Sequence, residues 1–198
     1  MKLRILAVLL VAVAAAACTP GWARQNDSDM LLLMDIVAAS AGGEGEEATQ
    51  LLSDPRTPSI VNDNAVLTFR VMPKNPNAFV TPETGIGFVN DVILRRYTIR
   101  YYRADGRSVE GVDVPYSISG EMNTRVEAGG TEVETSVIVV RHQAKMEPPL
   151  RNFTGFGGQG ALTMFAEISV YGETISQRAV SATGRLEIVF IDFADDDA

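Results

Sequence analysis

The sequence is poor in the residues from which disulfides and zinc sites are built. Its 198 residues include one cysteine, one histidine and one tryptophan. A single cysteine cannot form a disulfide within the chain. One histidine without a free cysteine cannot complete a zinc site of the usual four-ligand type. The stability of the fold must therefore come from the burial of apolar side chains.

The chain is also short of positive charge. It carries 17 Lys and Arg residues against 25 Asp and Glu, a formal net charge of −8 at pH 7. Nucleic-acid binding needs a surplus of cations to neutralise phosphates, so we expect no nucleic-acid partner. The negative charge favours solubility and carries no information about the fold.

Long apolar runs are absent except near the start of the chain. Residues 5–17 form an unbroken run of thirteen, after Lys2 and Arg4 and before Cys18. A membrane-spanning helix needs about 20 such residues. A charged start, a short apolar segment and a small-residue end are typical of a secretory signal. We therefore predict that residues 1–17 are removed.

The end of this run resembles the lipobox of bacterial lipoproteins. The resemblance rests on Ala15-Ala16-Ala17-Cys18. In that family the cysteine is acylated and becomes the first mature residue, which implies a covalent lipid on Cys18 and a location in the cell envelope. Thr19 rather than Asp follows the cysteine, which by the same resemblance implies the outer membrane. Ordinary cleavage after Ala17 is the alternative, because Ala15-x-Ala17 also fits a signal without lipid.

Removal of the signal leaves 181 residues and moves the formal net charge to −10. That length suffices for one domain with a proper core, or at most for two small ones. We predict a lipidated polar tether over residues 18–29, a β-sandwich domain over residues 30–194 and an acidic tail over residues 195–198. No second apolar run approaches membrane-spanning length, so the protein is expected to sit on the membrane through Cys18 without crossing it.

Strand patterns dominate the domain. Alternating apolar residues predict half-buried strands, and Met30 begins an apolar stretch that we also expect to be a strand. One predicted face consists of Leu67, Phe69 and Val71, and another of Ile93, Tyr97, Ile99 and Tyr101. A short helix is expected over residues 46–53. The expected strands cover residues 30–39, 65–72, 92–103, 112–119 (an edge strand with Pro115), 132–142, 161–171 and 177–193 (bent or bulged near Gly184).

Seven or eight strands with almost no helix predict an all-β fold. Turn signals at Asp105-Gly106 and Gly129-Gly130 separate consecutive strands. We expect an antiparallel two-sheet sandwich of immunoglobulin-like arrangement, without the Cys–Trp–Cys pin of antibody domains. A β-barrel is the alternative.

Two short motifs resemble a known domain family. They are Asn75-Pro76-Asn77 after a strand and Tyr97-Thr98-Ile99-Arg100-Tyr101, followed by a later strand pair. Together they resemble the water-stress and hypersensitive-response domain of late-embryogenesis-abundant proteins, over residues 65–193. That family is a small sandwich that includes bacterial lipoproteins. The resemblance implies a protective or binding role and supplies no catalytic residue.

No catalytic constellation emerges from the sequence. Gly155-x-Gly157-x-x-Gly160 has the spacing of a dinucleotide fingerprint, but a strand follows where a phosphate-binding helix is required. His142 ends a strand with no identifiable nucleophile or orienting acid. The pairs Glu132 with Glu134 and Glu110 with Asp113 are expected to be solvated. We therefore expect no catalytic residue, no cofactor and no enzyme; an envelope hydrolase with an unrecognised site is the alternative.

Calcium is the one metal for which donors are present. Oxygen-rich loops at the ends of a sandwich can supply its six to eight ligands. The candidates are Asn62-Asp63-Asn64, Asp91 and residues 192–197, although none matches the EF-hand loop. Polar turns explain these residues better, and no metal site is predicted.

Arginines on one predicted strand form the candidate interaction surface. Arg96 and Arg100 share a face, Arg103 follows closely, and His142 is included as an exposed strand end. Cross-strand pairing with Glu132 and Glu134 is the expected arrangement; contact with lipid phosphates or anionic glycans is the alternative. The predicted function is a lipid-anchored, non-catalytic binding or structural module for an envelope protein or glycan, with a stress-protective domain as a further alternative.

Overall fold

The computed structural model describes residues 28–39, 49–55, 61–75, 77, 86–152 and 161–191. These residues form eight strands and three short helices. The helices are η3 (Phe88–Asn90), α2 (His142–Lys145) and η4 (Leu150–Asn152). The strands are β1 (Met30–Ala39), β2 (Gln50–Ser53), β3 (Asp63–Pro73), β4 (Val92–Arg103), β5 (Ile118–Val126), β6 (Val133–Val140), β7 (Ala161–Thr174) and β8 (Ala179–Ile191).

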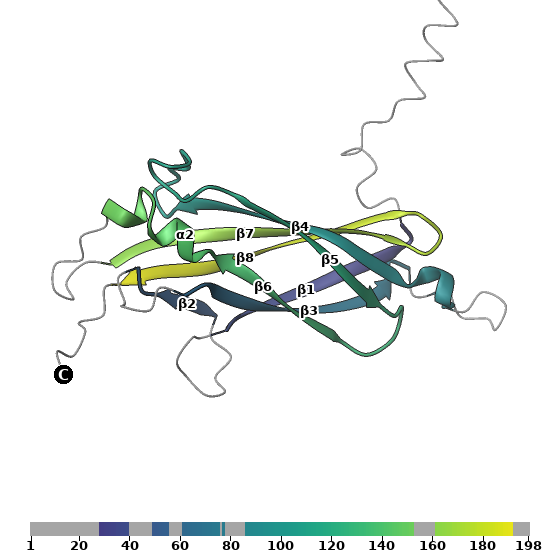
Figure 1. Cartoon of the computed structure of the whole chain (residues 1–198). Helices are drawn as coiled ribbons and strands as arrows, with labels where there is room; N and C mark the ends of the chain where they lie inside the picture. The colour runs from purple at the N-terminus through teal and green to yellow at the C-terminus, as the bar shows by residue number, and fades with distance from the viewer. Residues whose placement is uncertain are drawn as a thin grey trace, which may run out of the picture.

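The strands form two sheets that pack face to face (Figure 1). The smaller sheet has the order β1-β3-β6 and the larger the order β2-β8-β7-β4-β5. Neighbouring strands are antiparallel, with the exception of β2, which pairs in parallel with β8. The predicted all-β, two-sheet sandwich is confirmed, and the parallel β2–β8 pair is a departure from the expected purely antiparallel pairing.

The strand order is that of an immunoglobulin-like sandwich. In that arrangement strands A, B and E share one sheet, whereas G, F, C and C′ share the other. Here β1, β3 and β6 take the places of A, B and E, and β8, β7, β4 and β5 those of G, F, C and C′. The chain changes sheets between β1 and β2, so the first strand of the fold is divided between the two layers.

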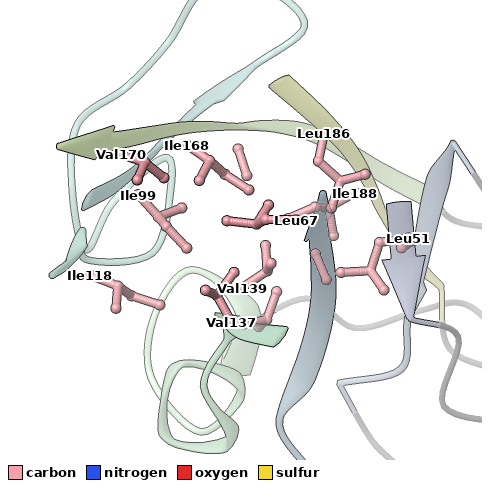
Figure 2. Close-up of a cluster of buried hydrophobic side chains, with 14 of the residues drawn as sticks. Leu51, Leu67, Ile99, Ile118, Val137, Val139, Ile168, Val170, Leu186 and Ile188 are labelled. Carbon is pink, nitrogen blue, oxygen red and sulfur yellow. The ribbon is translucent and has the colours of Figure 1, made fainter. Parts of the chain in front are cut away.

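The core lies between the sheets and follows the predicted alternation. Leu67, Phe69 and Val71 of β3 are buried, and so are Ile168 and Val170 of β7. Figure 2 shows such side chains from both sheets pointing toward one another in the space between the layers. Each fully buried aliphatic or aromatic side chain contributes about 1.5–3 kcal/mol to the free energy of unfolding. Apolar burial of this kind holds the two sheets together.

The predicted face of β4 is wrong at its first half. Ile93 was expected to point the same way as Ile99, but Val92 and Leu94 are the residues whose side chains enter the core. The strand register shifts between Leu94 and Arg96 against both of its neighbours, β5 and β7. Against β7, the two steps from Leu94 to Arg96 match the single step from Gly172 to Tyr171, so Arg95 is an extra residue in that pair. Against β5 the extra residue lies in β5, where Thr124 to Glu121 spans three steps. A bulge of this kind exchanges the two faces of a strand beyond it.

The type of one predicted element and the start of another are also wrong. The part of residues 46–53 that the structure describes is the strand β2 rather than a helix, because Leu51 and Ser53 are buried alternately beside β8. The strand expected over residues 112–119 begins only at Ile118. Pro115 lies before it, where the chain forms turns around Gly111 (φ 73°), and a proline cannot donate to a strand ladder.

The bulge that the sequence allowed near Gly184 is absent, and this glycine lies where β1 packs against β8. The register of β7 with β8 runs through Gly184 without a shift. A Cβ atom at this position would lie 2.6 Å from Cδ1 of Ile36. The absence of a side chain at Gly184 leaves room for the ends of Ile36 and Met34 of β1, which a larger residue would displace.

The turns at Asp105-Gly106 and Gly129-Gly130 are confirmed. The N–H of Gly106 donates to the Arg103 carbonyl at 2.9 Å, and Gly106 and Gly129 have φ values of 85° and 69°. The predicted tether, the glycine cluster at residues 155–160 and the acidic residues 192–198 lie outside the described residues, apart from Ser28 and Asp29.

Candidate interaction surface

The outer face of the larger sheet gathers arginines and aromatic rings from three neighbouring strands. At one end the guanidinium of Arg96 lies over the ring of Tyr171, 5.0 Å from its centroid. At the other end Tyr102 stacks with Phe165 at a centroid distance of 5.4 Å, and Arg185 lies 5.6 Å from the Tyr102 centroid. We call this surface the arginine–aromatic face; its members are Arg96, Arg100, Tyr102, Phe165, Glu167, Tyr171 and Arg185.

A row of hydroxyl groups separates the two aromatic groups. Thr98 of β4 is in register with Ser169 of β7, which is in register with Thr183 of β8. The hydroxyls of Ser169 and Thr183 are hydrogen-bonded at 3.0 Å. Because residues on one face of a strand alternate, the row lies between Tyr171 on one side and Phe165 on the other.

The bulge in β4 places a further exposed arginine, Arg95, beside Arg96 at the edge of this face. Arg95 and Arg96 are consecutive, yet both are exposed, because the extra residue interrupts the alternation. They line a shallow pocket of about 560 Å³ together with Tyr171, Gly172 and Gln177. A Cβ atom on Gly172 would lie 2.5 Å from the Ile93 carbonyl oxygen. The tight contact of β7 with the bulged strand therefore depends on this glycine.

Arginine and glutamate alternate across the face. Arg185 pairs with Glu167 at 3.7 Å and Arg95 with Glu173 at 3.4 Å. Arg100 is in register with Glu167, and Arg96 with Glu121. Within the described part of the chain, neither Arg96 nor Arg100 forms an ion pair of 4.0 Å or less. Glu121 and Glu167 therefore lie beside Arg96 and Arg100 and partly offset their positive charges, although no direct ion pair forms between them.

The predicted partners of these arginines are wrong. Glu132 pairs with Arg70 at 3.7 Å, and Glu134 is in register with Thr68. Both glutamates belong to the β6 region and face β3 in the smaller sheet, so they lie in the other layer from Arg96 and Arg100. The acids of β7 instead pair across strands with Arg95 and Arg185, and local sequence patterns do not show which acids lie beside β4.

The other two predicted residues of the interaction surface lie elsewhere. Arg103 ends β4, and its Nε is 3.9 Å from Oδ1 of Asp105. His142 begins α2; its N–H donates to Oδ1 of Asn62 at 2.8 Å, and its Nδ1 lies 3.3 Å from the same oxygen. In the described residues His142 contacts no nucleophile or acid that would make it a catalytic base.

A buried charge cluster lies beneath α2. One oxygen of the Asp63 carboxylate is 3.0 Å from Nζ of Lys145, and the other accepts a hydrogen bond of 2.6 Å from the Ser53 hydroxyl. The two charged side chains are only 2% and 4% exposed. The cluster joins β2, β3 and α2 at the end of the sandwich where β6 leaves the sheet.

Two of the candidate calcium donors, Asp63 and Asp91, are engaged by other groups. Asp63 is held by Lys145 and Ser53. Asp91 accepts from Arg125 at 2.6 and 3.1 Å and from the Ala128 N–H at 2.9 Å. Among the residues that the structure describes, no three or more His, Cys, Asp or Glu side chains gather as a metal site would require. Residues 192–197 lie outside that set.

Comparisons with known proteins add little to this geometry. No protein-family model matches the chain, and no curated protein matches it. One solved structure, described as the X-ray structure of Northeast Structural Genomics Consortium target SoR45, is similar over 82% of this chain and 87% of that chain. Its sequence identity is 8% and its TM-score is 0.35, so neither fold nor function is inferred from it.

The resemblances to bacterial lipoproteins and to the water-stress domain remain predictions. In the Asn75-Pro76-Asn77 motif of the water-stress resemblance, the N–H of Asn77 donates to Oδ1 of Asn75 at 3.1 Å, while Pro76 lies outside the described residues. No helix in the described segments has the length and apolar character needed to cross a membrane.

Sequence reasoning missed most of the arginine–aromatic face. It identified Arg96 and Arg100 but not Tyr171, Phe165 or Arg185. The signal was present, because these three occupy the outward positions of alternating strands. The sequence alone does not show that β4, β7 and β8 are neighbours in one sheet.

Proposed function

We propose that the protein is a lipid-anchored bacterial envelope lipoprotein that acts as a non-catalytic binding module. In this proposal Cys18 carries the lipid, and the arginine–aromatic face contacts another envelope protein. The observation that carries the proposal is the placement of Arg96 over Tyr171 and of Arg185 over Tyr102 on one face of the larger sheet.

Composition favours a protein partner for this face. Tyr, Phe and Arg are enriched in the cores of protein interfaces, whereas Lys is depleted. Tyr and Arg are also among the residues that dominate binding energy in such interfaces. On the described strands of the larger sheet, every outward cation is an arginine. Arginines held over aromatic rings are already ordered, which reduces the entropy lost on binding.

Charge supports a specific rather than a general attraction. The mature protein is strongly acidic, but this face alternates Arg185 with Glu167 and Arg95 with Glu173. An interface with both signs of charge selects a partner with the complementary pattern and disfavours others. The hydroxyl row through Ser169 supplies further hydrogen-bonding groups between the two aromatic ends.

The test is site-specific photo-crosslinking in the native envelope. A photoreactive residue replaces Arg100, in the middle of the face, and in a second strain replaces Arg70, an exposed arginine of the other sheet. We expect one discrete protein adduct from position 100 and none from position 70. Adding Arg96→Ala and Arg185→Ala should reduce the adduct at least several-fold.

Two results would contradict the proposal. Equal adducts from positions 100 and 70 would mean that the face is not selective. Absence of protein adducts, together with retention of the protein on isolated cell-wall glycan that the two alanine substitutions abolish, would identify a glycan as the ligand instead.

A further inference from the structure

Four exposed apolar side chains gather at one end of the sandwich. Phe88 is 69% exposed, Val89 44%, Ile86 38% and Ile175 37%. We call these residues the apolar tip. The β7–β8 turn lies against η3, because the N–H of Ser176 donates to the Val89 carbonyl at 3.2 Å. The tip is therefore one structure made from two loops.

The N-terminal part of the described chain is fastened at this same end. The N–H of Ser28 donates to the Ala179 carbonyl at 3.3 Å, and Arg178 pairs with Asp29 at 3.0 Å. Both partners belong to the β7–β8 turn region that also carries Ile175. Figure 1 shows the start of β1, the β7–β8 turn and η3 together at one end of the molecule.

Chain length places the proposed lipid close to this end. Cys18 precedes Ser28 by ten residues. Ten residues span at most about 35 Å even when fully extended. By contrast, β4 alone carries the chain twelve residues away from the tip to Arg103, a distance of about 40 Å. The apolar tip is thus the end of the domain nearest to a lipid on Cys18.

Exposure alone does not single out this end. Val112 and Tyr116, beyond the far end of β4, are also more than half exposed. The difference between the two ends is the place at which the chain from Cys18 joins the domain. A lipid on that cysteine holds the apolar tip at a high effective concentration near the bilayer, whereas the far end, about 40 Å from the tip, lies beyond the roughly 35 Å that the extended tether spans.

We propose that the apolar tip docks into the lipid bilayer, with Phe88, Val89 and Ile175 in the interfacial layer. This inference rests on the proposed lipid anchor. Apolar side chains at a membrane interface are stabilised by burial in the boundary between headgroups and acyl chains. A second contact besides one anchor fixes the orientation of the domain: the strands point away from the membrane, and the arginine–aromatic face stands to the side, open to a partner.

The full-length lipidated protein allows a direct test. Its only native cysteine carries the lipid in this proposal, so Phe88→Cys introduces a single free thiol for an environment-sensitive fluorophore. Val112→Cys is the matched control, because it is equally exposed and lies at the opposite end. Both labelled proteins are reconstituted into vesicles of phosphatidylethanolamine and phosphatidylglycerol, with and without spin-labelled lipids as quenchers.

We expect the probe at position 88 to emit at shorter wavelength and to be quenched several-fold more by spin-labelled lipid than the probe at position 112. Equal quenching, or stronger quenching at position 112, would overturn the docking proposal. The docking proposal would also be overturned if the probe at position 88 were shielded in native envelopes but exposed to water in pure lipid vesicles. That result would mean that a protein, rather than lipid, covers the tip.

The intact mass of the same preparations distinguishes a failure of tip docking from a failure of the proposed lipid anchor on Cys18. A lipidated chain with a water-exposed position-88 probe overturns tip docking alone and leaves the proposed anchor intact. A chain without lipid overturns the anchor and tip docking together. Because Phe88 is mostly exposed, its replacement is not expected to disturb folding, and a circular-dichroism spectrum confirms this for each variant.

Discussion

The Tyr101 hydroxyl donates a hydrogen bond to the backbone carbonyl of Val139, and so joins β4 of the larger sheet to β6 of the smaller one. Both residues are buried. In antibody domains a disulfide and a tryptophan hold the two sheets together; the single cysteine of this chain precludes that disulfide. Here apolar burial does most of this work, and Tyr101 adds a directional bond through the core.

Tyr101→Phe tests this link. The substitution keeps the ring but leaves the buried Val139 carbonyl without its donor, which costs about 1–3 kcal/mol of the free energy of unfolding. Urea denaturation measures the loss. Tyr116→Phe, at an exposed position, is the control and should be nearly neutral; equal effects of the two substitutions would mean that the bond contributes nothing.

The same tyrosine predicts a fall in stability at alkaline pH. Burial is the main cause that raises the pKa of Tyr101, whereas the unfolded pKa is about 10. The folded state therefore retains a proton that the unfolded state loses, and stability falls as the pH rises above the unfolded pKa. Above about pH 10, the wild type should lose stability with pH more steeply than Tyr101→Phe. Parallel curves for the two proteins would contradict this account.

The buried pair of Asp63 and Lys145 predicts a strong asymmetry between single and double substitutions. Lys145→Met leaves the Asp63 charge buried without a cation, and loss of one partner from such a pair costs about 3–5 kcal/mol. Adding Asp63→Asn removes that charge and keeps a partner for Ser53. Denaturant unfolding should therefore find the double variant more stable than Lys145→Met alone.

A surface pair provides the control for that experiment. Arg178 and Asp29 form an ion pair of similar length, 3.0 Å, but their side chains are 51% and 70% exposed. Arg178→Met should cost no more than about 1 kcal/mol, because solvent screens exposed pairs. A cost at Lys145 as small as the cost at Arg178 would show that the interior cluster is not rigidly held.

Gly172 and Gly87 form a matched pair for testing the bulge. A Cβ atom at Gly172 would meet the Ile93 carbonyl oxygen at 2.5 Å and the Leu94 Cα at 3.0 Å, whereas at Gly87 it would meet nothing within 4 Å. Gly172→Ala should cost about 1–3 kcal/mol through overpacking. Gly87→Ala should be neutral or slightly stabilising, by up to about 1 kcal/mol. Thermal unfolding of both variants measures the difference.

The sequence was sufficient for the class of fold because alternation is a local property. Leu67, Phe69 and Val71 repeat every second residue, and that pattern alone places them on one buried face. The same rule failed at Ile93, because the bulge at Arg95 depends on how β4 fits β5 and β7. Local patterns do not contain that information.

The polar groups that shape the site were less predictable. Lys145 lies 82 residues from Asp63, and nothing in either neighbourhood marks them as a pair. Tyr171 and Phe165 likewise join Arg96 and Tyr102 only once β7 lies beside β4. Sequence reasoning found two of the three arginines of the arginine–aromatic face, but pairing between distant strands decided what surrounds them.

The central claim is that this sandwich is held to a membrane through Cys18. The most direct measurement is the intact mass of the mature protein extracted from membranes, with a Cys18→Ser variant beside it. The account predicts a chain that begins at Cys18 and carries the added mass of a diacylglyceryl group, and a variant that is neither lipidated nor retained in the membrane fraction. A mature chain with no lipid on Cys18 would contradict it.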